Sequence, residues 1–166
     1  MTRRPRTVSG TAGPRFMGVR LVPTMLLADA STDACAMVRD ALLEGVGPAD
    51  LRTVSTAAEL HDYLHRQGDH EDERTSPMPA LILVDAELPG NEDLDAVRSI
   101  KSNPRLRRIP VVVLAAAPDA GLIAASYDAG ANTVIPKPVT FIALVKLMKV
   151  FTGYWLDAAA LPPEPA

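Results

Sequence analysis

Five short apolar runs, separated by segments of helical length, constrain the fold of this 166-residue chain more than any other feature. The runs cover residues 24–28, 51–55, 80–84, 110–114 and 132–135. The run at 111–114 does not alternate with polar residues, as expected of a strand that is buried on both faces. Strands that alternate with helices favour a parallel sheet covered by helices on both sides. The chain is therefore predicted to form one α/β domain of five βα units.

Helical patterns follow the runs. In the first, Ala34, Met37, Val38, Ala41 and Leu42 have the spacing of one helix face, before a glycine-rich stop. The other helix markers are Thr56 and Glu59 as a capping box, Leu60 and Leu64 on the second helix, Leu94, Val97 and Ile100 on the third, Asp119 as the cap of the fourth, and a fifth helix from near Val139 to about Leu156.

Charge is spread unevenly along the chain. The formal net charge is −3, but residues 1–24 hold five arginines and no acid, which leaves 12 basic and 20 acidic residues for the rest. An acidic body argues against nucleic acid as the main partner of the folded part.

We predict a disordered basic tail at 1–22, a folded domain at 23–157 and a disordered tail at 158–166. The chain shows no signal peptide or membrane span, and its lone Cys35 suits a reducing cytoplasm.

Three charged residues follow the ends of apolar runs. Asp29 and Asp85 end the first and third runs, and Lys137 ends the fifth. In open α/β sheets the carboxyl ends of the strands are where ligands bind. Two aspartates and a lysine at strand ends are typical of a site that handles phosphate.

The chain resembles the receiver domains of two-component response regulators, most of all the small stand-alone receivers that partner bacterial phytochromes. The resemblance covers about residues 23–157 and depends on Leu81-Ile82-Leu83-Val84-Asp85, Leu88-Pro89, the stretch at 107–114, Tyr127-Asp128-Ala129-Gly130-Ala131-Asn132, Lys137-Pro138-Val139 and Tyr154-Trp155-Leu156. It implies a flavodoxin-like, CheY-like, doubly wound sheet in the strand order 2-1-3-4-5. It also implies a histidine kinase as partner and Asp85 as the phosphoacceptor. In such a site Lys137 pairs with the phosphoryl group, and Asp29 helps to hold Mg²⁺.

The sequence departs from the family pattern at four places. Ala30 replaces the second metal-binding acid, Ala115 the hydroxyl residue of the fourth strand, Val134 the aromatic switch residue and Asp93 a glycine. Only a weak Mg²⁺ site is expected, from Asp29, Asp85 and the backbone carbonyl of Glu87. We therefore expect phosphorylation of Asp85 to be impaired or absent.

The last helix carries more apolar residues than one face of a helix needs. Phe141, Leu144, Val145, Met148 and Phe151 form a stripe, and Ile142, Val150, Tyr154 and Trp155 extend beyond it. Either the monomer buries this excess, or a partner covers it. The second reading predicts an interface that includes Phe151, Tyr154 and Trp155, and a possible homodimer through the helix 4–strand 5–helix 5 face.

His61 and His65 have the spacing of two metal ligands on one helix. A solvent-exposed helix face without a metal is the favoured interpretation of this pair.

Three functional hypotheses follow. The first is a degenerate receiver, a non-enzymatic module that binds a histidine kinase or another signalling protein without depending on phosphorylation. The second is a working Mg²⁺-dependent phosphoacceptor with a weakened metal site. The third is a structural adaptor that uses the last helix. No output domain is expected after residue 157, so the signal would leave through binding another protein.

Overall fold

The computed structural model describes residues 22–165, so the predicted basic tail lies outside the described residues except for Val22. Its strands are β1 (Thr24–Ala28), β2 (Asp50–Val54), β3 (Leu81–Asp85), β4 (Val111–Ala115) and β5 (Thr133–Pro136). They form one sheet in the order β2-β1-β3-β4-β5, and every neighbouring pair is parallel. The predicted strand order is confirmed.

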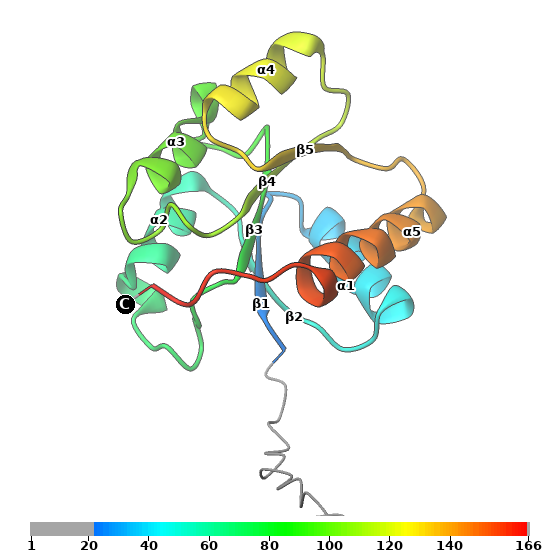
Figure 1. Cartoon of the computed structure of the whole chain (residues 1–166), viewed down its shortest axis with the longest axis horizontal. Helices are drawn as coiled ribbons and strands as arrows, with labels where there is room; N and C mark the ends of the chain where they lie inside the picture. The colour runs from blue at the N-terminus through cyan, green and yellow to red at the C-terminus, as the bar shows by residue number, and fades with distance from the viewer. Residues whose placement is uncertain (1–21, 166) are drawn as a thin grey trace, which may run out of the picture.

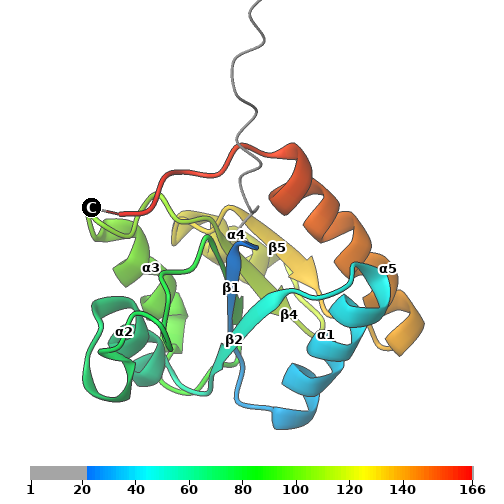
Figure 2. The ribbon, with the colours of Figure 1, turned by 90° about the horizontal axis from the view of Figure 1, so that it is seen from below.

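Helices cover both faces of the sheet (Figures 1 and 2). On one face lie α1 (Thr32–Gly45) and α5 (Phe141–Thr152); on the other lie α2 (Ala57–His65), α3 (Asp95–Ser102) and α4 (Ala120–Asp128). Each face has its own hydrophobic cluster, because neighbouring strand residues point to opposite sides. Leu26 and Ile82 pack toward α2 and α3, whereas Leu27 and Leu83 pack toward α1 and α5.

The central strands are buried on both faces and the edge strands are not. All residues of β1 and β4 are buried, as are the first four of β3, so that Asp85 is the first partly open position on that strand. β2 and β5 lie at the edges and are partly exposed. The continuous apolar runs therefore mark the middle of the sheet.

Four helices begin at side chains that cap them. Ser31, Thr56, Asp119 and Thr140 each accept a hydrogen bond from the backbone N–H three residues later. The capping box at Thr56 is only half as predicted, because the Glu59 carboxylate accepts from the N–H and hydroxyl of Ser55 rather than from the N–H of Thr56. These caps fix where each helix leaves the site end of the sheet.

Two details of the helices differ from the prediction. Met37 was expected to face inward but is 42% exposed, and Cys35 is buried instead, so the buried stripe of α1 is Cys35, Val38, Ala41 and Leu42. The fifth helix begins at Phe141 and not near Val139, which is 94% exposed, because Thr140 provides the cap. A π-helical turn, η3 (Gly153–Ala158), continues α5 to its end.

Three short segments complete the described chain. The 3₁₀ turns η1 (Gly68–His70) and η2 (Glu92–Leu94) follow α2 and precede α3. Residues 159–165 form no helix or strand and run from the end of α5 toward the α2–α3 side of the molecule (Figures 1 and 2). The predicted disorder of this tail stays a prediction. Within residues 22–165, none of the helices has the length and apolar character that crossing a bilayer requires.

Candidate functional site

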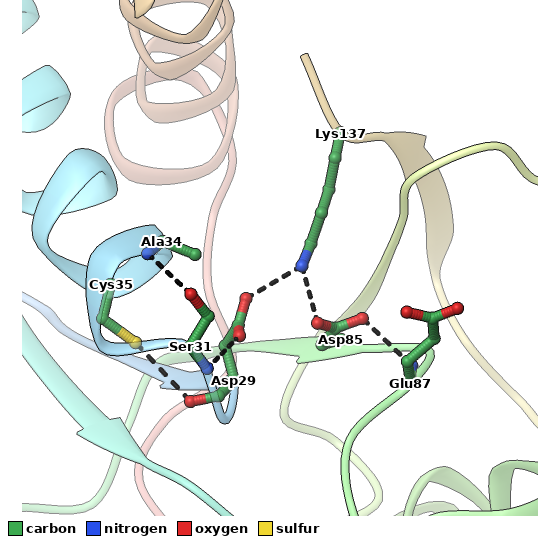
Figure 3. A network of polar contacts seen from close by, with 7 residues as sticks. All are labelled: Asp29, Ser31, Ala34, Cys35, Asp85, Glu87 and Lys137. Carbon is green, nitrogen blue, oxygen red and sulfur yellow. Dashed lines mark hydrogen bonds and ion pairs between the residues drawn. The ribbon is translucent and has the colours of Figure 1, made fainter. Parts of the chain in front are cut away.

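The three predicted site residues meet at one end of the sheet. The strand register pairs Ala28 with Val84, and Lys137 follows Pro136, which pairs with Ala115. The carboxyl ends of β1, β3 and β5 therefore bring Asp29, Asp85 and Lys137 to the same edge, and Figure 3 shows the lysine pointing between the two acids. A hydrogen bond of 2.8 Å from the backbone N–H of Lys137 to the carbonyl of Ala115 holds the lysine backbone against β4.

Lys137 bridges the two aspartates. Its Nζ lies 2.9 Å from Oδ2 of Asp29 and 2.6 Å from Oδ2 of Asp85. Asp29 is buried, at 5% exposure, and the Asp85 and Lys137 side chains are mostly buried. Charge-assisted hydrogen bonds in such surroundings are strong, because few waters compete for the charged atoms.

The remaining carboxylate oxygens also have donors. Oδ1 of Asp29 accepts from the N–H of Ser31 at 2.8 Å, and Oδ1 of Asp85 accepts from the N–H of Glu87 at 3.0 Å (Figure 3). All four carboxylate oxygens are thus hydrogen-bonded within the chain. The hydrogen-bonding needs of both carboxylates are therefore met by the chain itself. The three side chains together carry two negative charges and one positive charge, a net charge of −1.

The bridge also determines the protonation of the lysine. Burial on its own would lower the pKa of Lys137, but the hydrogen bonds to Asp85 and Asp29 and the attraction of both carboxylates outweigh it and raise the pKa above its ordinary value. Lys137 is therefore a fixed cation at neutral pH.

Three of the four positions that depart from the family pattern lie on β4, on β5 or just after β1. Ala115 is buried at the end of β4, so a methyl group occupies the position where the resemblance predicts a hydroxyl. Val134 is partly buried and packs on the α2–α3–α4 side of the sheet. Ala30 is exposed and adds no carboxylate to the site. None of these three positions supplies a side-chain donor or acceptor to the site.

These residues fit a metal ion poorly. Mg²⁺ prefers six oxygen ligands in near-octahedral geometry. Both carboxylates already bind Lys137, and among residues 22–165 there is no group of three or more His, Cys, Asp or Glu side chains that could hold a metal ion. The backbone N–H of Glu87 donates to the carboxylate of Asp85, and the role of its backbone carbonyl as a metal ligand stays a prediction. A metal ion bound here would have to share both carboxylates with Lys137.

A small apolar cavity lies behind the bridge, between α1 and α5. It measures about 110 Å³, and its wall includes Val38, Leu114 and Met148, with Asp29 and Lys137 at the polar end. The Cys35 thiol lies close by and donates to the carbonyl of Asp29 at 3.6 Å. Burial, with the charge of Asp29, raises the pKa of this thiol. The cavity could not be predicted from the sequence, since most of its wall residues are ordinary core positions.

The histidine pair does not form a metal site. The rings of His61 and His65 stack, with centroids 4.0 Å apart, and His65 contacts Asn103 and its own helix backbone. Stacked rings do not converge on one point, so the predicted solvated face agrees with this arrangement.

The three predicted interface residues differ in how far their side chains are buried. Phe151 is buried at 4% exposure and belongs to the α1–α5 core, Trp155 is partly buried against that core, and Tyr154 is 59% exposed. Ile142 and Val150 are also exposed. A hollow of about 510 Å³ lies between the β5 end of the sheet and α5, and Tyr154 and Trp155 form part of its wall. The described chain therefore leaves much of the apolar excess of α5 uncovered.

Comparison with known proteins gives a consistent result. Residues 25–149 match the family model of the response regulator receiver domain. The chain is 30% identical over 138 residues to response regulator Rcp1 of Synechocystis, which covers 83% of this chain and 91% of that protein. It resembles the crystal structure of the phosphorylated cyanobacterial phytochrome response regulator RcpA, with a TM-score of 0.76 and 31% identity over 86% of this chain and 100% of that one. The Mn²⁺-bound form of Rcp1 gives a TM-score of 0.75 and 30% identity, over 85% and 99% of the two chains.

Proposed function

The chain belongs to the response regulator receiver family of two-component signalling systems, and we propose that it works through protein contacts that do not require a phosphoryl group on Asp85. In this proposal the protein is a binding module in the cytoplasm and not an enzyme. Its partner is a histidine kinase or another signalling protein, and a second copy of the chain binds at the α5 surface.

The bridge of Lys137 between Asp29 and Asp85 is the observation that carries the proposal. The lysine neutralises part of the charge that a metal ion would otherwise offset, and every carboxylate oxygen already has a donor. A phosphoryl group on Asp85 would also lack the hydroxyl that Ala115 replaces. Such a charge-assisted hydrogen bond contributes about 1.5–3 kcal/mol.

The route by which phosphorylation would change the surface is also incomplete. In the family that this chain resembles, the hydroxyl of the fourth strand and an aromatic residue of the fifth strand move together. Here Ala115 and Val134 occupy those positions, and neither can form that hydrogen bond or fill the space of a ring. We infer that the α4–β5–α5 face keeps one conformation whatever the state of Asp85.

The exposed part of α5 is the contact surface that this proposal requires. Val150 and Tyr154 are exposed at the wall of the hollow at β5, and Ile142 is exposed at the start of α5. Exposed apolar groups gathered on one helix mark an interaction site. A second copy of the chain would present the same apolar surface, and isologous pairing is the commonest way in which soluble proteins associate.

Sedimentation of the full chain tests both parts of the proposal. We expect self-association that is unchanged by acetyl phosphate with Mg²⁺ and unchanged in Asp85→Asn. The double variant Ile142→Asp, Val150→Asp should be monomeric. Leu43→Asp, which alters an exposed leucine on α1, is the matched control and should associate as the unaltered chain does. Association that appears only after acetyl phosphate treatment would contradict the proposal.

A second candidate function is a metal-dependent phosphoacceptor. It is favoured by the convergence of Asp29, Asp85 and Lys137 at one strand edge, which keeps three of the parts that the chemistry needs. Relatives described as phosphorylated and as Mn²⁺-bound also support it. A Mg²⁺-dependent adduct on Asp85 under the same treatment would select this candidate.

A further inference from the structure

The cavity behind the carboxylate bridge is an unfilled space in an otherwise packed core. We call it the α1–α5 cavity, after the two helices that lie side by side around it (Figures 1 and 2), and it measures about 110 Å³. Apart from Asp29 and Lys137, every residue of its wall is apolar. Leu27, Leu83 and Leu114 are the wall residues that come from the sheet. Protein interiors leave few voids larger than a water molecule, so a space of this size is a candidate for a ligand.

The α1–α5 cavity can be reached from solvent at one side. Met37 of α1 lines the cavity and is 42% exposed. Ala34, Pro138 and Leu147 also belong to the wall and are partly exposed, whereas the other apolar wall residues are buried. A methionine side chain is unbranched and adapts easily to its surroundings. A small molecule therefore has a path into the cavity that does not require the sheet to open.

The polar end of the cavity does not favour a polar ligand. Each carboxylate oxygen of Asp29 already has a donor, the N–H of Ser31 at 2.8 Å and Nζ of Lys137 at 2.9 Å. In the described part of the chain the one buried side-chain polar atom without a partner is Nδ2 of Asn91, and Asn91 is not part of this wall. A polar ligand would exchange its hydrogen bonds to water for a wall made mostly of carbon. An anion would in addition meet the net charge of −1 of the bridge.

The size and the lining of the cavity together select the class of ligand. A cavity of about 150 Å³ lined by leucine, isoleucine and phenylalanine stays dry and binds benzene or xenon. The α1–α5 cavity has a comparable aliphatic lining, is smaller and is open at one side. A ligand in it would give the wall atoms the van der Waals contacts that they lack and would remove its own apolar surface from water.

We propose that the α1–α5 cavity binds a small neutral apolar molecule, no larger than a single six-membered ring. The ligand lies against Leu83 and Leu114 of the sheet and between Val38 of α1 and Met148 of α5. The proposal goes beyond the function described above and does not depend on the state of Asp85. Because the cavity exists only when α1 and α5 are packed on the sheet, the ligand stabilises the folded chain in proportion to its concentration.

NMR titration of the full chain with benzene tests the proposal. We expect saturable shifts of the methyl groups of Val38, Leu114 and Met148, and a Tm that rises with benzene concentration. The methyl groups of Ile82 and Ile100, which lie in the core on the opposite face of the sheet, should not shift. Benzoate, which carries the same ring with a negative charge, should leave the cavity signals unchanged. An absence of saturable shifts, equal shifts on both faces of the sheet, or an equal response to benzoate would overturn the proposal.

A pair of alanine variants locates the binding. Ala34→Leu places a larger side chain in the wall of the cavity and should weaken benzene binding at least tenfold. Ala36→Leu makes the same change at an exposed position of α1 outside the wall, and it should bind benzene as the unaltered chain does. If Ala34→Leu does not fold, the smaller Ala34→Val decides the question and should also bind more weakly. Unchanged benzene binding in a folded Ala34 variant would refute the assignment of the ligand to this cavity.

Discussion

The ammonium group of Lys137 lies 2.6 Å from a carboxylate oxygen of Asp85, the residue that matches the phosphoacceptor of the family. The same ammonium lies 2.9 Å from Asp29, so one lysine serves both acids. This relationship ties the ends of β1, β3 and β5 together. The carboxylate site is thus a structural link as well as a candidate for phosphorylation.

Replacing Lys137 with methionine should destabilise the domain. The carboxylates of Asp29 and Asp85 are mostly buried, and the substitution would remove their counter-charge. Breaking a buried ion pair in this way costs about 3–5 kcal/mol. Because the lysine is partly exposed, we expect a loss of about 2–3 kcal/mol in the free energy of unfolding, measured by urea denaturation at neutral pH. Lys146→Met, at an exposed position on α5, should change it by less than about 0.5 kcal/mol. Equal effects of the two substitutions would show that the bridge adds nothing to stability.

Replacing Ala30 with aspartate should strengthen Mg²⁺ binding. The substitution adds a third carboxylate next to Asp29, and each charged oxygen ligand improves the fit to a hard cation. We expect at least a tenfold fall in the Mg²⁺ dissociation constant. It would be measured from the NMR shifts of the Asp85 and Glu87 amides as Mg²⁺ is added. Ala158→Asp, at an exposed position on η3, adds the same charge elsewhere and should leave the affinity unchanged. An Ala30→Asp protein that binds Mg²⁺ no better would mean that Lys137 keeps its hold on both acids.

Tyr63 should make stability depend on pH in the alkaline range. Burial of this side chain raises the pKa of Tyr63 to about 12, and its hydroxyl donates to the carbonyl of Pro77 at 2.8 Å. A raised pKa stabilises the fold below the unfolded pKa of about 10, and this stability is lost as the pH rises through the folded value. We expect the unaltered chain to lose about 2–3 kcal/mol more than Tyr63→Phe between those two pH values.

Denaturation curves across this range would measure the difference. Lys137 also titrates at high pH, but both proteins contain it, so its effect cancels in the comparison. Tyr127→Phe, which alters an exposed tyrosine, should follow the curve of the unaltered chain. Parallel curves for Tyr63→Phe and the unaltered chain would contradict the prediction.

Replacing Asp93 with glycine should stabilise the domain. The residue has a φ of 52°, which glycine adopts without the steric cost that a side chain brings. We expect a gain of about 0.5–1 kcal/mol in the free energy of unfolding. Asp95→Gly is the matched control, because Asp95 has a φ of −60° and begins α3, and there glycine should destabilise by about 1 kcal/mol. A loss of stability in Asp93→Gly would show that its side chain makes a contact that outweighs the strain.

Much of the fold could be predicted because the apolar runs and the caps act locally. The apolar runs predicted the bounds of the five strands to within one or two residues. Thr56 and Asp119 cap α2 and α4, as the sequence predicted. The inward face of α1 could not be predicted in the same way. Met37 and Cys35 lie two positions apart on the helix, and which of them is buried depends on how α1 packs against the sheet and α5.

For the candidate site too, some features could be predicted from the sequence and others could not. The positions of Asp29, Asp85 and Lys137 at strand ends could be predicted, and their opposite charges favour a pairing of the lysine with the acids. The distances of the bridge could not be predicted, since they depend on how three strands are placed. Phe151 was expected at the interface and lies in the core instead, because its place on the helix stripe turns it toward α1. The departure at Asp93 was visible in the sequence, but the left-handed backbone that this side chain has to adopt was not. The unpaired amide of Asn91 had no signal in the sequence.

Phosphorylation of Asp85 is the most direct test. The full chain, a variant with Ala30→Asp and Ala115→Thr, and that variant with Asp85→Asn added would be incubated with acetyl phosphate and Mg²⁺ and measured by intact mass. We expect no adduct on the unaltered chain, a Mg²⁺-dependent adduct on the double variant, and its loss when Asp85 is replaced. A Mg²⁺-dependent adduct of comparable yield on the unaltered chain would contradict the proposal that this receiver works without phosphorylation.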